Sequence, residues 1–252
     1  MRAALAIGLS GATDARAIRA LAPLIERLGF SGLWLNDVPN GDSLAGLRVA
    51  ASVTSTLRLA TGVIPLDRRP VEGLDLGALP MERTTLGIGS GAARHPVGLV
   101  ERGIASLRRA TGAAIVVGAL GPRMRRLAAE RADGVLFNWL TPSAAARAHS
   151  ELQGAAGERR VRSVLYVRTI TDEGARAGLE HEADRYATVP SYAANFDRLG
   201  IRAIDATMDG PSGLRAFDVV DEIVLRAVTP WGSLAELEGF VEDVAGWRMA
   251  AG

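Results

Sequence analysis

The segment that decides the fold runs from Thr111 to Pro142 and reads TGAAIVVGALGPRMRRLAAERADGVLFNWLTP. Its apolar run at 113–117 has the length and the β-branched content of a buried strand. After a turn at 118–122, residues 123–132 carry apolar side chains on one helical face and arginines on the other. A second apolar run follows at 135–137. The segment therefore predicts a strand–helix–strand unit with parallel strands and a right-handed connection.

The turn between this strand and helix is a candidate anion site. Pro122 suits the first helical position, where a missing N–H costs no hydrogen bond. The free N–H groups of such a first turn lie at the positive end of the helix dipole, where an anion binds favourably. An ordinary tight turn, with glycines for geometry only, is the alternative. The motif alone favours that alternative.

The same alternation of short apolar runs and helical patterns covers the whole chain. Strands are expected at 3–9, 32–35, 57–62, 84–88, 113–117, 135–137, 161–169 and 223–228. Helices are expected at 13–28, 43–55, 99–110, 123–132, 142–152, 172–187, 190–199 and 233–247, with a short or irregular one at 71–79. Residues 203–208 could add a small extra strand, and residues 209–213 are typical of a turn.

Eight strand–helix units without a linker predict one domain over residues 1–252. Strands that alternate with helices indicate a parallel sheet, and eight such units match a closed (β/α)8 barrel. An open doubly wound sheet is the competing α/β architecture, but it would need a switch point that the pattern lacks. In a barrel, functional residues are expected at the C-terminal ends of the strands.

Composition excludes several classes of function. The formal net charge is +1, which provides no electrostatic basis for binding nucleic acid or an anionic membrane. No run is long enough to span a membrane, and the apolar N-terminus is too short for a signal sequence. We therefore expect a cytoplasmic protein that binds a small-molecule substrate.

The chain contains neither cysteine nor lysine. A thiolate nucleophile, lysine Schiff-base chemistry and a lysine-bearing phosphate loop are thereby excluded. The histidines His95, His149 and His181 do not have a metal-ligand spacing, so we expect no metal site. If the protein is an enzyme, we expect an organic cofactor to carry the chemistry.

The expected strand ends are rich in glycine and small polar residues. They read Gly8 to Ser10, Asn36-Asp37, Gly62-Val63, Gly89-Ser90-Gly91, Gly118 to Pro122, Asn138-Trp139, Arg168-Thr169 and Thr229 to Trp231. A planar ring can approach the backbone at glycines and pack against apolar side chains. Glycines also end strands for purely structural reasons, so the pattern favours a flat ligand only when the strand ends are taken together.

Four blocks of the chain resemble the bacterial luciferase-like monooxygenase family. They are GFSGLWLND (29–37), TSTLRLATGVIPLDRRPV (54–71), TTLGIGSG (84–91) and ALGPRMRRLAAERADGVLFNWLTP (119–142). They occur in the order found in that family, and they are most similar to its oxidoreductases that use the deazaflavin coenzyme F420 in place of FMN. Residues 155–214 match this pattern weakly.

The resemblance implies a flavin or deazaflavin ring at the C-terminal mouth of the barrel. Gly62-Val63 would form the non-proline cis peptide behind the ring, and Asp37 would lie near the pyrimidine edge of the ring. Gly89, Ser90 and Gly91 would line the same site.

The remaining site residues implied by the resemblance come from the opening segment. The loop Ala119-Leu120-Gly121-Pro122 would bind the cofactor phosphate through N–H groups. Arg123 would assist by charge, with a solvated surface arginine as the alternative. Asn138 and Trp139 would face the ring or the substrate, with a buried core tryptophan as the alternative for Trp139.

Two departures bear on the reaction. Val38 stands where the alcohol and sugar dehydrogenases of the family have a histidine base, and Ser90 stands where they have a glutamate. We therefore expect an F420-dependent reductase of an activated C=C or C=N, with solvent or Asp37 as the proton donor. A reduced-FMN-dependent monooxygenase and a non-catalytic flavin-binding protein are the alternatives. Relatives also suggest a homodimer.

Overall fold

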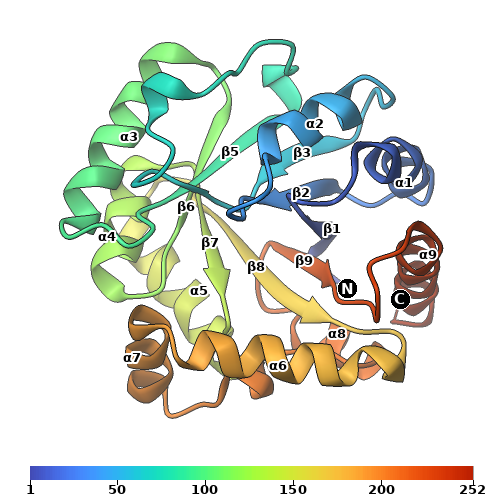
Figure 1. The fold of residues 1–252 in the computed structure, drawn as a ribbon. Coiled ribbons are helices and arrows are strands. Elements are labelled where there is room, and N and C mark those ends of the chain that lie inside the picture. The colour runs from blue at the N-terminus through green and yellow to red at the C-terminus, as the bar shows by residue number, and fades with distance from the viewer. Residues whose placement is uncertain (252) are drawn as a thin grey trace.

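The computed structural model describes residues 1–251, with side chains described through Arg248, and shows one barrel enclosed by helices (Figure 1). The strands are β1 (Ala4–Ser10), β2 (Gly32–Asn36), β3 (Arg58–Thr61), β4 (Ile64–Pro65), β5 (Thr84–Gly89), β6 (Ala114–Gly118), β7 (Gly134–Asn138), β8 (Arg162–Thr169) and β9 (Glu222–Ala227).

The helices are α1 (Ala15–Arg27), α2 (Ser43–Ala51), α3 (Pro96–Ala110), α4 (Pro122–Arg131), α5 (Pro142–Ala156), α6 (Arg176–Ala187), α7 (Pro190–Leu199), α8 (Pro211–Ala216) and α9 (Leu234–Ala251). Short 3-10 turns lie at η1 (Val71–Gly73), η2 (Met81–Arg83), η3 (Glu173–Ala175) and η4 (Ala203–Ala206). No helix in the described chain has both the length and the apolarity needed to cross a membrane.

The sheet is closed and parallel, which confirms the predicted (β/α)8 barrel and excludes the open sheet. The strand order is β3-β2-β1-β9-β8-β7-β6-β5-β4, and β3 also pairs with β5. The closing pairs are Leu59 with Thr84 and Ala60 with Thr85. Because β4 continues β3 after a short interruption and pairs with the same neighbour β5, the two segments together act as the third of eight barrel strands.

The predicted small strand at 203–208 is wrong for most of its length. Residues 203–206 form the 3-10 turn η4, and only Met208 makes an isolated parallel bridge, to Thr169. Of the expected turn at 209–213, residues 209–210 precede the six-residue helix α8 and residues 211–213 are its first three. Local apolar content suggested a strand, but the barrel edge beside β8 is already occupied by β9, so a longer strand has no partner to pair with.

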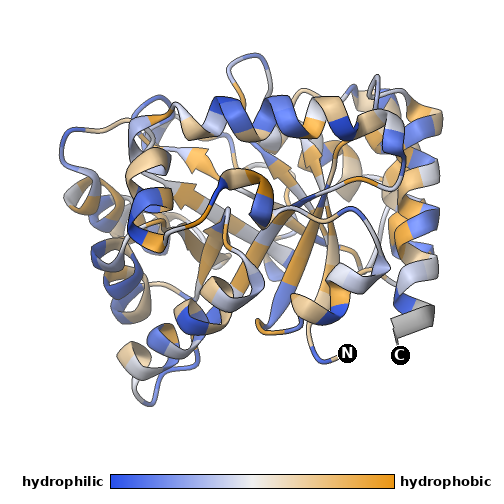
Figure 2. Cartoon of the chain, turned by 90° about the horizontal axis from the view of Figure 1, so that it is seen from below, coloured by the Kyte–Doolittle hydropathy of each residue, from blue (hydrophilic) through white to orange (hydrophobic). Residues whose placement is uncertain are grey.

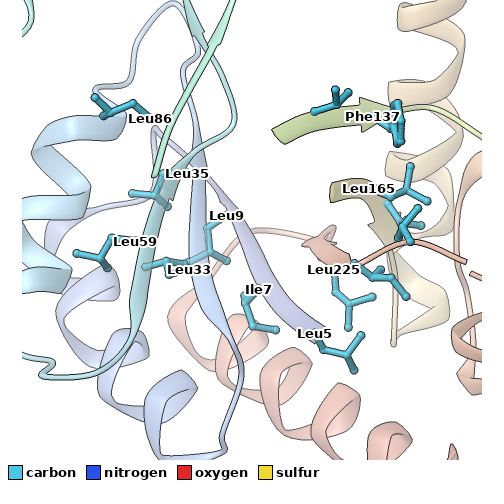
Figure 3. Close-up of a cluster of buried hydrophobic side chains, with 14 of the residues drawn as sticks. Leu5, Ile7, Leu9, Leu33, Leu35, Leu59, Leu86, Phe137, Leu165 and Leu225 are labelled. Atoms are coloured by element: carbon cyan, nitrogen blue, oxygen red, sulfur yellow. The ribbon is translucent and has the colours of Figure 1, made fainter. Parts of the chain in front are cut away.

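Strand residues alternate between two separate cores. Those that point outward pack under the helices, and Figure 3 shows several of them, including Leu33, Leu35 and Leu225. Those that point inward form a second cluster inside the barrel, made of Ala6, Trp34, Ala60, Val116, Leu136, Val164, Tyr166 and Val224, with Val63 packed against it. In Figure 2 the strands are largely hydrophobic, and the helices around them mix hydrophilic and hydrophobic residues. Strands buried on both faces are typical of a parallel barrel.

The third strand is interrupted where the peptide Gly62–Val63 is cis, as the family resemblance implied. The side chain of Thr61 replaces the ladder hydrogen bonds that are missing there. Its hydroxyl donates to the Gly87 carbonyl at 2.9 Å and accepts from the Gly87 N–H at 2.8 Å. The two strands are so close that a Cβ on Gly87 would lie 1.9 Å from the Thr61 carbonyl oxygen. Barrel closure therefore depends on a glycine that faces a threonine.

Thr61→Val tests this closure. The substitution keeps the shape of a fully buried side chain but leaves the N–H and C=O of Gly87 without their partner. Leaving buried polar groups unpaired costs about 1–3 kcal/mol each, so we expect the free energy of unfolding to fall by about 2–4 kcal/mol in urea titration. The control Thr188→Val removes an exposed hydroxyl bond and should change stability by less than about 0.5 kcal/mol. Equal effects would contradict the role of Thr61.

Candidate active site at the C-terminal mouth of the barrel

The C-terminal mouth of the barrel is open to solvent. Most inward-facing residues at this end are half-exposed, with Gly89 and Arg168 as buried exceptions, and the layer below them is buried. The half-exposed set is Ser10, Asn36, Gly62, Val63, Gly118, Asn138 and Arg226. Trp34, Val164 and Val224 form part of the buried floor beneath. An apolar floor with half-exposed polar residues above it is common in small-molecule sites.

The glycines predicted to line this site accommodate Val63. A Cβ on Gly89 would lie 2.7 Å from Val63 Cγ2, and one on Gly118 would lie 3.1 Å from Val63 Cγ1. Gly62 itself packs against Trp34 and Tyr166, where a Cβ would approach to 3.1 and 3.3 Å. These glycines therefore let a single valine enter the centre of the mouth.

Ser90 and Gly91 follow β5 at the rim. Gly91 adopts φ 57°, and a Cβ there would lie 1.8 Å from Oδ1 of Asp67. The same carboxylate accepts the N–H of Ala92 at 2.9 Å, so this glycine is required by a tight turn. His95 is the exposed N-cap residue of α3, without a side-chain capping bond.

Asp37 is buried beside the mouth and is fully engaged. Its side chain is 2% exposed, and both carboxylate oxygens accept from Arg69 Nη1, at 2.9 and 2.7 Å. Oδ1 also accepts the N–H of Ser43, the first residue of α2. Burial alone would lower the pKa of Arg69, but Asp37 and Asp42 raise it. A carboxylate held this way by a permanent cation is better suited to positioning the loop than to donating a proton.

The predicted phosphate loop opens α4 without a side-chain cap. Gly121 is the N-cap residue, Pro122 is the first helical residue, and no side chain bonds to the first turn. Ala119 is buried, and its N–H bonds to the Leu136 carbonyl, so it is not available to a ligand. Arg123 is exposed. The half-exposed residues Leu120 and Gly121 and the N-terminus of α4 thus remain as the candidate anion-binding part of the loop.

Asn138 and Trp139 lie at the end of β7 and both contact Arg168 of β8. The Arg168 guanidinium donates to Oδ1 of Asn138 and stacks over the Trp139 ring at 4.1 Å. Asn138 Nδ2 in turn donates to the Tyr192 hydroxyl at 3.4 Å. These contacts fix the orientation of the Asn138 amide. Trp139 is fully buried, with φ 54°, a conformation that bulky residues rarely adopt.

The segment between β8 and β9 supplies the charge and the rings that surround Arg168. Glu182 of α6 accepts from Arg168 Nε at 3.0 Å, and the Tyr186 ring lies 4.9 Å below the guanidinium. Burial raises the pKa of Glu182, but the charges of Arg168 and Arg226 and the hydrogen bond from Arg168 outweigh it, so the net shift is downward. Tyr186, Tyr192 and Phe196 pack on Trp139 as one aromatic cluster.

Four buried polar groups at this end of the barrel have no hydrogen-bond partner among the described residues. They are Oδ1 of Asn36, Oγ of Ser43, Nε1 of Trp139 and the hydroxyl of Tyr166. Burial raises the pKa of Tyr166 to about 12, although Arg226 and Arg168 act in the opposite direction, so this hydroxyl stays protonated at neutral pH. Buried polar groups are nearly always satisfied in folded proteins, so each of these calls for water or a ligand.

Sequence reasoning did not find Arg69, Tyr166, Glu182, Tyr192 or Arg226. Tyr166 and Arg226 had a usable signal, because period-two counting along β8 and β9 places them on the inward face. Arg69 lies in the family-like block at 54–71, but nothing in the sequence indicated its ion pair with Asp37. Glu182 and Tyr192 come from a region without a recognisable pattern and reach the site only through tertiary packing.

The opposite end of the barrel has a cavity of about 430 Å3 that is rich in arginine. Its cations are already engaged. Arg83 donates to three backbone carbonyls and to the Thr54 hydroxyl, Arg162 pairs with Glu222, and Arg108 pairs with Asp133 at 2.7 Å. This is typical of the stabilising end of a barrel. Among the described residues, no cluster of three or more His, Asp or Glu side chains could hold a metal ion.

A sequence model of the luciferase-like monooxygenase family matches residues 3–101. This confirms the resemblance for the three sequence blocks at 29–37, 54–71 and 84–91, which contain Asp37, the cis peptide and the glycines of β5. The fourth block, at 119–142, lies outside the match. No curated protein matches the sequence significantly.

Solved structures of flavin- and deazaflavin-dependent enzymes share the fold. The coenzyme F420-dependent tetrahydromethanopterin reductase from Methanopyrus kandleri is 16% identical, with a TM-score of 0.66, over 97% of this chain and 98% of that one. An F420-dependent secondary alcohol dehydrogenase is 12% identical, with a TM-score of 0.72, over 97% and 99%. The FMN-containing oxygenating component of 3,6-diketocamphane monooxygenase from Pseudomonas putida is 15% identical, with a TM-score of 0.65, over 96% and 99%. At these identities the likeness concerns the fold.

Glu182→Gln tests the ion pair under the mouth. Removing one charge leaves Arg168 buried and unpaired, and we expect a loss of about 3 kcal/mol in the free energy of unfolding at pH 7. Because the pKa of Glu182 is lowered on folding, the pair stabilises the protein above about pH 4.3, and this contribution is lost as the pH falls.

Urea titrations at a series of pH values measure this effect. The difference between the parent protein and Glu182→Gln should shrink as the pH falls from 7 toward 3. The matched control Glu180→Gln, exposed on the same helix, should stay within about 0.5 kcal/mol of the parent at every pH. A difference that does not depend on pH would contradict the assignment.

Proposed function

We propose that the protein is an oxidoreductase that binds coenzyme F420 at the C-terminal mouth of the barrel and reduces an activated C=C or C=N. The observation that carries this proposal is the open mouth with an apolar floor and unpartnered buried polar groups around it. The family match and the F420-dependent structural neighbours support it. We further propose a homodimer, an expectation from the family resemblance, and a cytoplasmic location, an expectation from composition.

The residues of the mouth suit a planar ring with an anionic tail. Val63 at the centre of the mouth offers an apolar surface, and the glycines around it have no side chains that would cover that surface. Asn36 Oδ1 is an unpaired acceptor that can receive an N–H group of a pyrimidine ring. The uncapped N-terminus of α4 can receive a phosphate.

Positioning and proton control follow from the contacts. Reduced F420, when bound, supplies the hydride. Asp37, fixed by Arg69 and by the N–H of Ser43, positions the loop that borders the mouth. Asn138, fixed by Arg168, keeps a defined amide orientation toward the mouth. Because Asp37 is fully engaged, we propose solvent rather than Asp37 as the proton donor.

A reduced-FMN-dependent monooxygenase is the second candidate. The FMN-containing neighbour favours it, and the anion-binding loop would suit the phosphate of FMN equally well. A non-catalytic flavin-binding protein is the third candidate. It is favoured by Val38 and Ser90, which stand where dehydrogenases of the family have proton-transfer residues.

Fluorescence titration of the purified protein with oxidised F420 and, separately, with FMN tests the proposal. We expect micromolar or tighter binding of F420 and weaker binding of FMN, followed by turnover of unsaturated acceptors with reduced F420. Binding of FMN alone would favour the monooxygenase. If neither cofactor bound, the proposed enzymatic function would be rejected.

Gly121→Asp tests the anion site of the loop. Gly121 has φ −98°, and a Cβ there meets no atom within 4 Å, so the backbone accepts a side chain. Aspartate is a good N-cap residue, and we expect the melting temperature to stay the same or rise slightly. The new carboxylate would occupy the place of the cofactor phosphate and would repel it. We therefore expect cofactor affinity to fall at least about 100-fold.

Gly121→Ala is the matched control, because it adds a side chain without a charge. It should keep the affinity for F420 or FMN within about threefold of the parent protein. If Gly121→Asp bound the cofactor as tightly as Gly121→Ala, the phosphate site would have to lie elsewhere on the barrel.

A further inference from the structure

Arg226 is a cation at the mouth that has no carboxylate of its own. It follows Val224 on the inward face of β9, and its register partners are Gly8 of β1 and Arg168 of β8. Its side chain is half-exposed, and its guanidinium donates to the carbonyl of Ala227. Within the described chain it forms no ion pair. An inward-facing arginine at a barrel mouth is therefore left with donors for an external partner.

The charges around Arg226 do not balance. Arg168 and Arg226 stand side by side on adjacent strands, and Glu182 is paired with Arg168 at 3.0 Å. Burial raises the pKa of Tyr166 and of Tyr192 to about 12, so both are neutral at physiological pH. Arg185 of α6 adds a further positive charge that acts on Glu182. The sector made by the ends of β1, β8 and β9 thus has two guanidinium groups and one carboxylate, an excess of one positive charge.

The Tyr166 hydroxyl lies one layer below Arg226 and is also unpartnered. Tyr166 is in register with Val224, two residues before Arg226, and its side chain is 3% exposed. Gly8 allows the hydroxyl to approach β1, because a Cβ there would lie only 3.0 Å from it. A buried hydroxyl without a hydrogen-bond partner, beneath an arginine that forms no ion pair within the described chain, is an arrangement that an anion would complete.

We propose that this sector of the mouth, formed by Arg226 and the Tyr166 hydroxyl, is an anion subsite that binds a carboxylate of the substrate. The inference rests on the proposed function in placing the substrate at the mouth, and it names the substrate class: a small unsaturated carboxylic acid. The subsite is separate from the phosphate loop, because β7 and β8 lie between β9 and the β6 end from which that loop begins.

Benzoate and benzamide are suitable probes, since they share size and planarity and differ in charge. Their dissociation constants are measured by calorimetry and by saturation-transfer NMR at low salt, with the parent protein. We expect benzoate to bind at least about tenfold more tightly than benzamide, because only the carboxylate of benzoate can form a charge-assisted hydrogen-bonded pair with Arg226. Equal affinities, or binding of neither probe, would overturn the proposal.

Variants locate the site. Arg226→Gln should reduce the preference for benzoate to about twofold or less, while Arg226→Lys, which keeps the charge but loses the planar fork, should retain part of it. Arg147→Gln, an exposed change of the same charge on α5, should keep the full preference. If Arg226→Gln kept the full preference, or if both Arg226 variants lost it equally, recognition by the charge of Arg226 would be overturned.

Competition with the cofactor shows whether Arg226 binds a carboxylate of the substrate or an anionic group of the cofactor. Simultaneous binding of benzoate and oxidised F420 would support a substrate subsite. Displacement of benzoate by one equivalent of F420 would assign Arg226 to the cofactor and overturn the proposal. If neither F420 nor FMN bound but benzoate still required Arg226, the proposed cofactor chemistry would fail and the anion subsite would stand.

Discussion

The closure of the sheet between β3 and β5 is the constraint on which the rest of the structure depends. Only two residue pairs join these strands directly before the chain departs from the ladder, and the Thr61 hydroxyl then takes over both hydrogen bonds of Gly87. This departure sends Val63 into the centre of the mouth, where the glycines at 89 and 118 make room for it. The closure of the barrel and the floor of the candidate site are therefore one structural feature.

Arginine side chains hold the acidic and amide groups of the mouth in place. Arg69 holds Asp37 and Asp42, and Arg168 holds Glu182 and Asn138, so each of these acidic or amide groups is fixed by a cation that cannot lose its proton. The site thus contains positioned acceptors and donors but few groups that titrate near neutral pH. Such a mouth suits chemistry in which a cofactor transfers the hydride and the protein orients the reactants. Arg226 differs from the other two, because its charge is left for a ligand.

The barrel itself could be read from the sequence because its signals are local. The apolar runs and the helical faces between them predicted all eight barrel strands, and the Gly-Pro turn predicted the start of α4 within one residue. The Gly62–Val63 cis peptide was also anticipated, but through resemblance rather than through the physics of the residues. The strand predicted at 203–208 was wrong, because the β preference of a short apolar segment is too weak to displace the strand pairs already formed next to it.

The sequence by itself determined the fold class, the residues at the strand ends and the exclusion of cysteine and lysine chemistry, since these depend on composition and on periodicity. Only the tertiary structure decided which partner each polar group has. Asp37 contacts Arg69 from 32 positions away, Asn138 contacts Tyr192 from 54, and Arg226 forms no ion pair within the described chain, although its charge acts on Glu182. Hydrogen bonds and ion pairs act over a few ångströms in space, and separations along the chain do not reveal which groups come within that reach once the barrel closes.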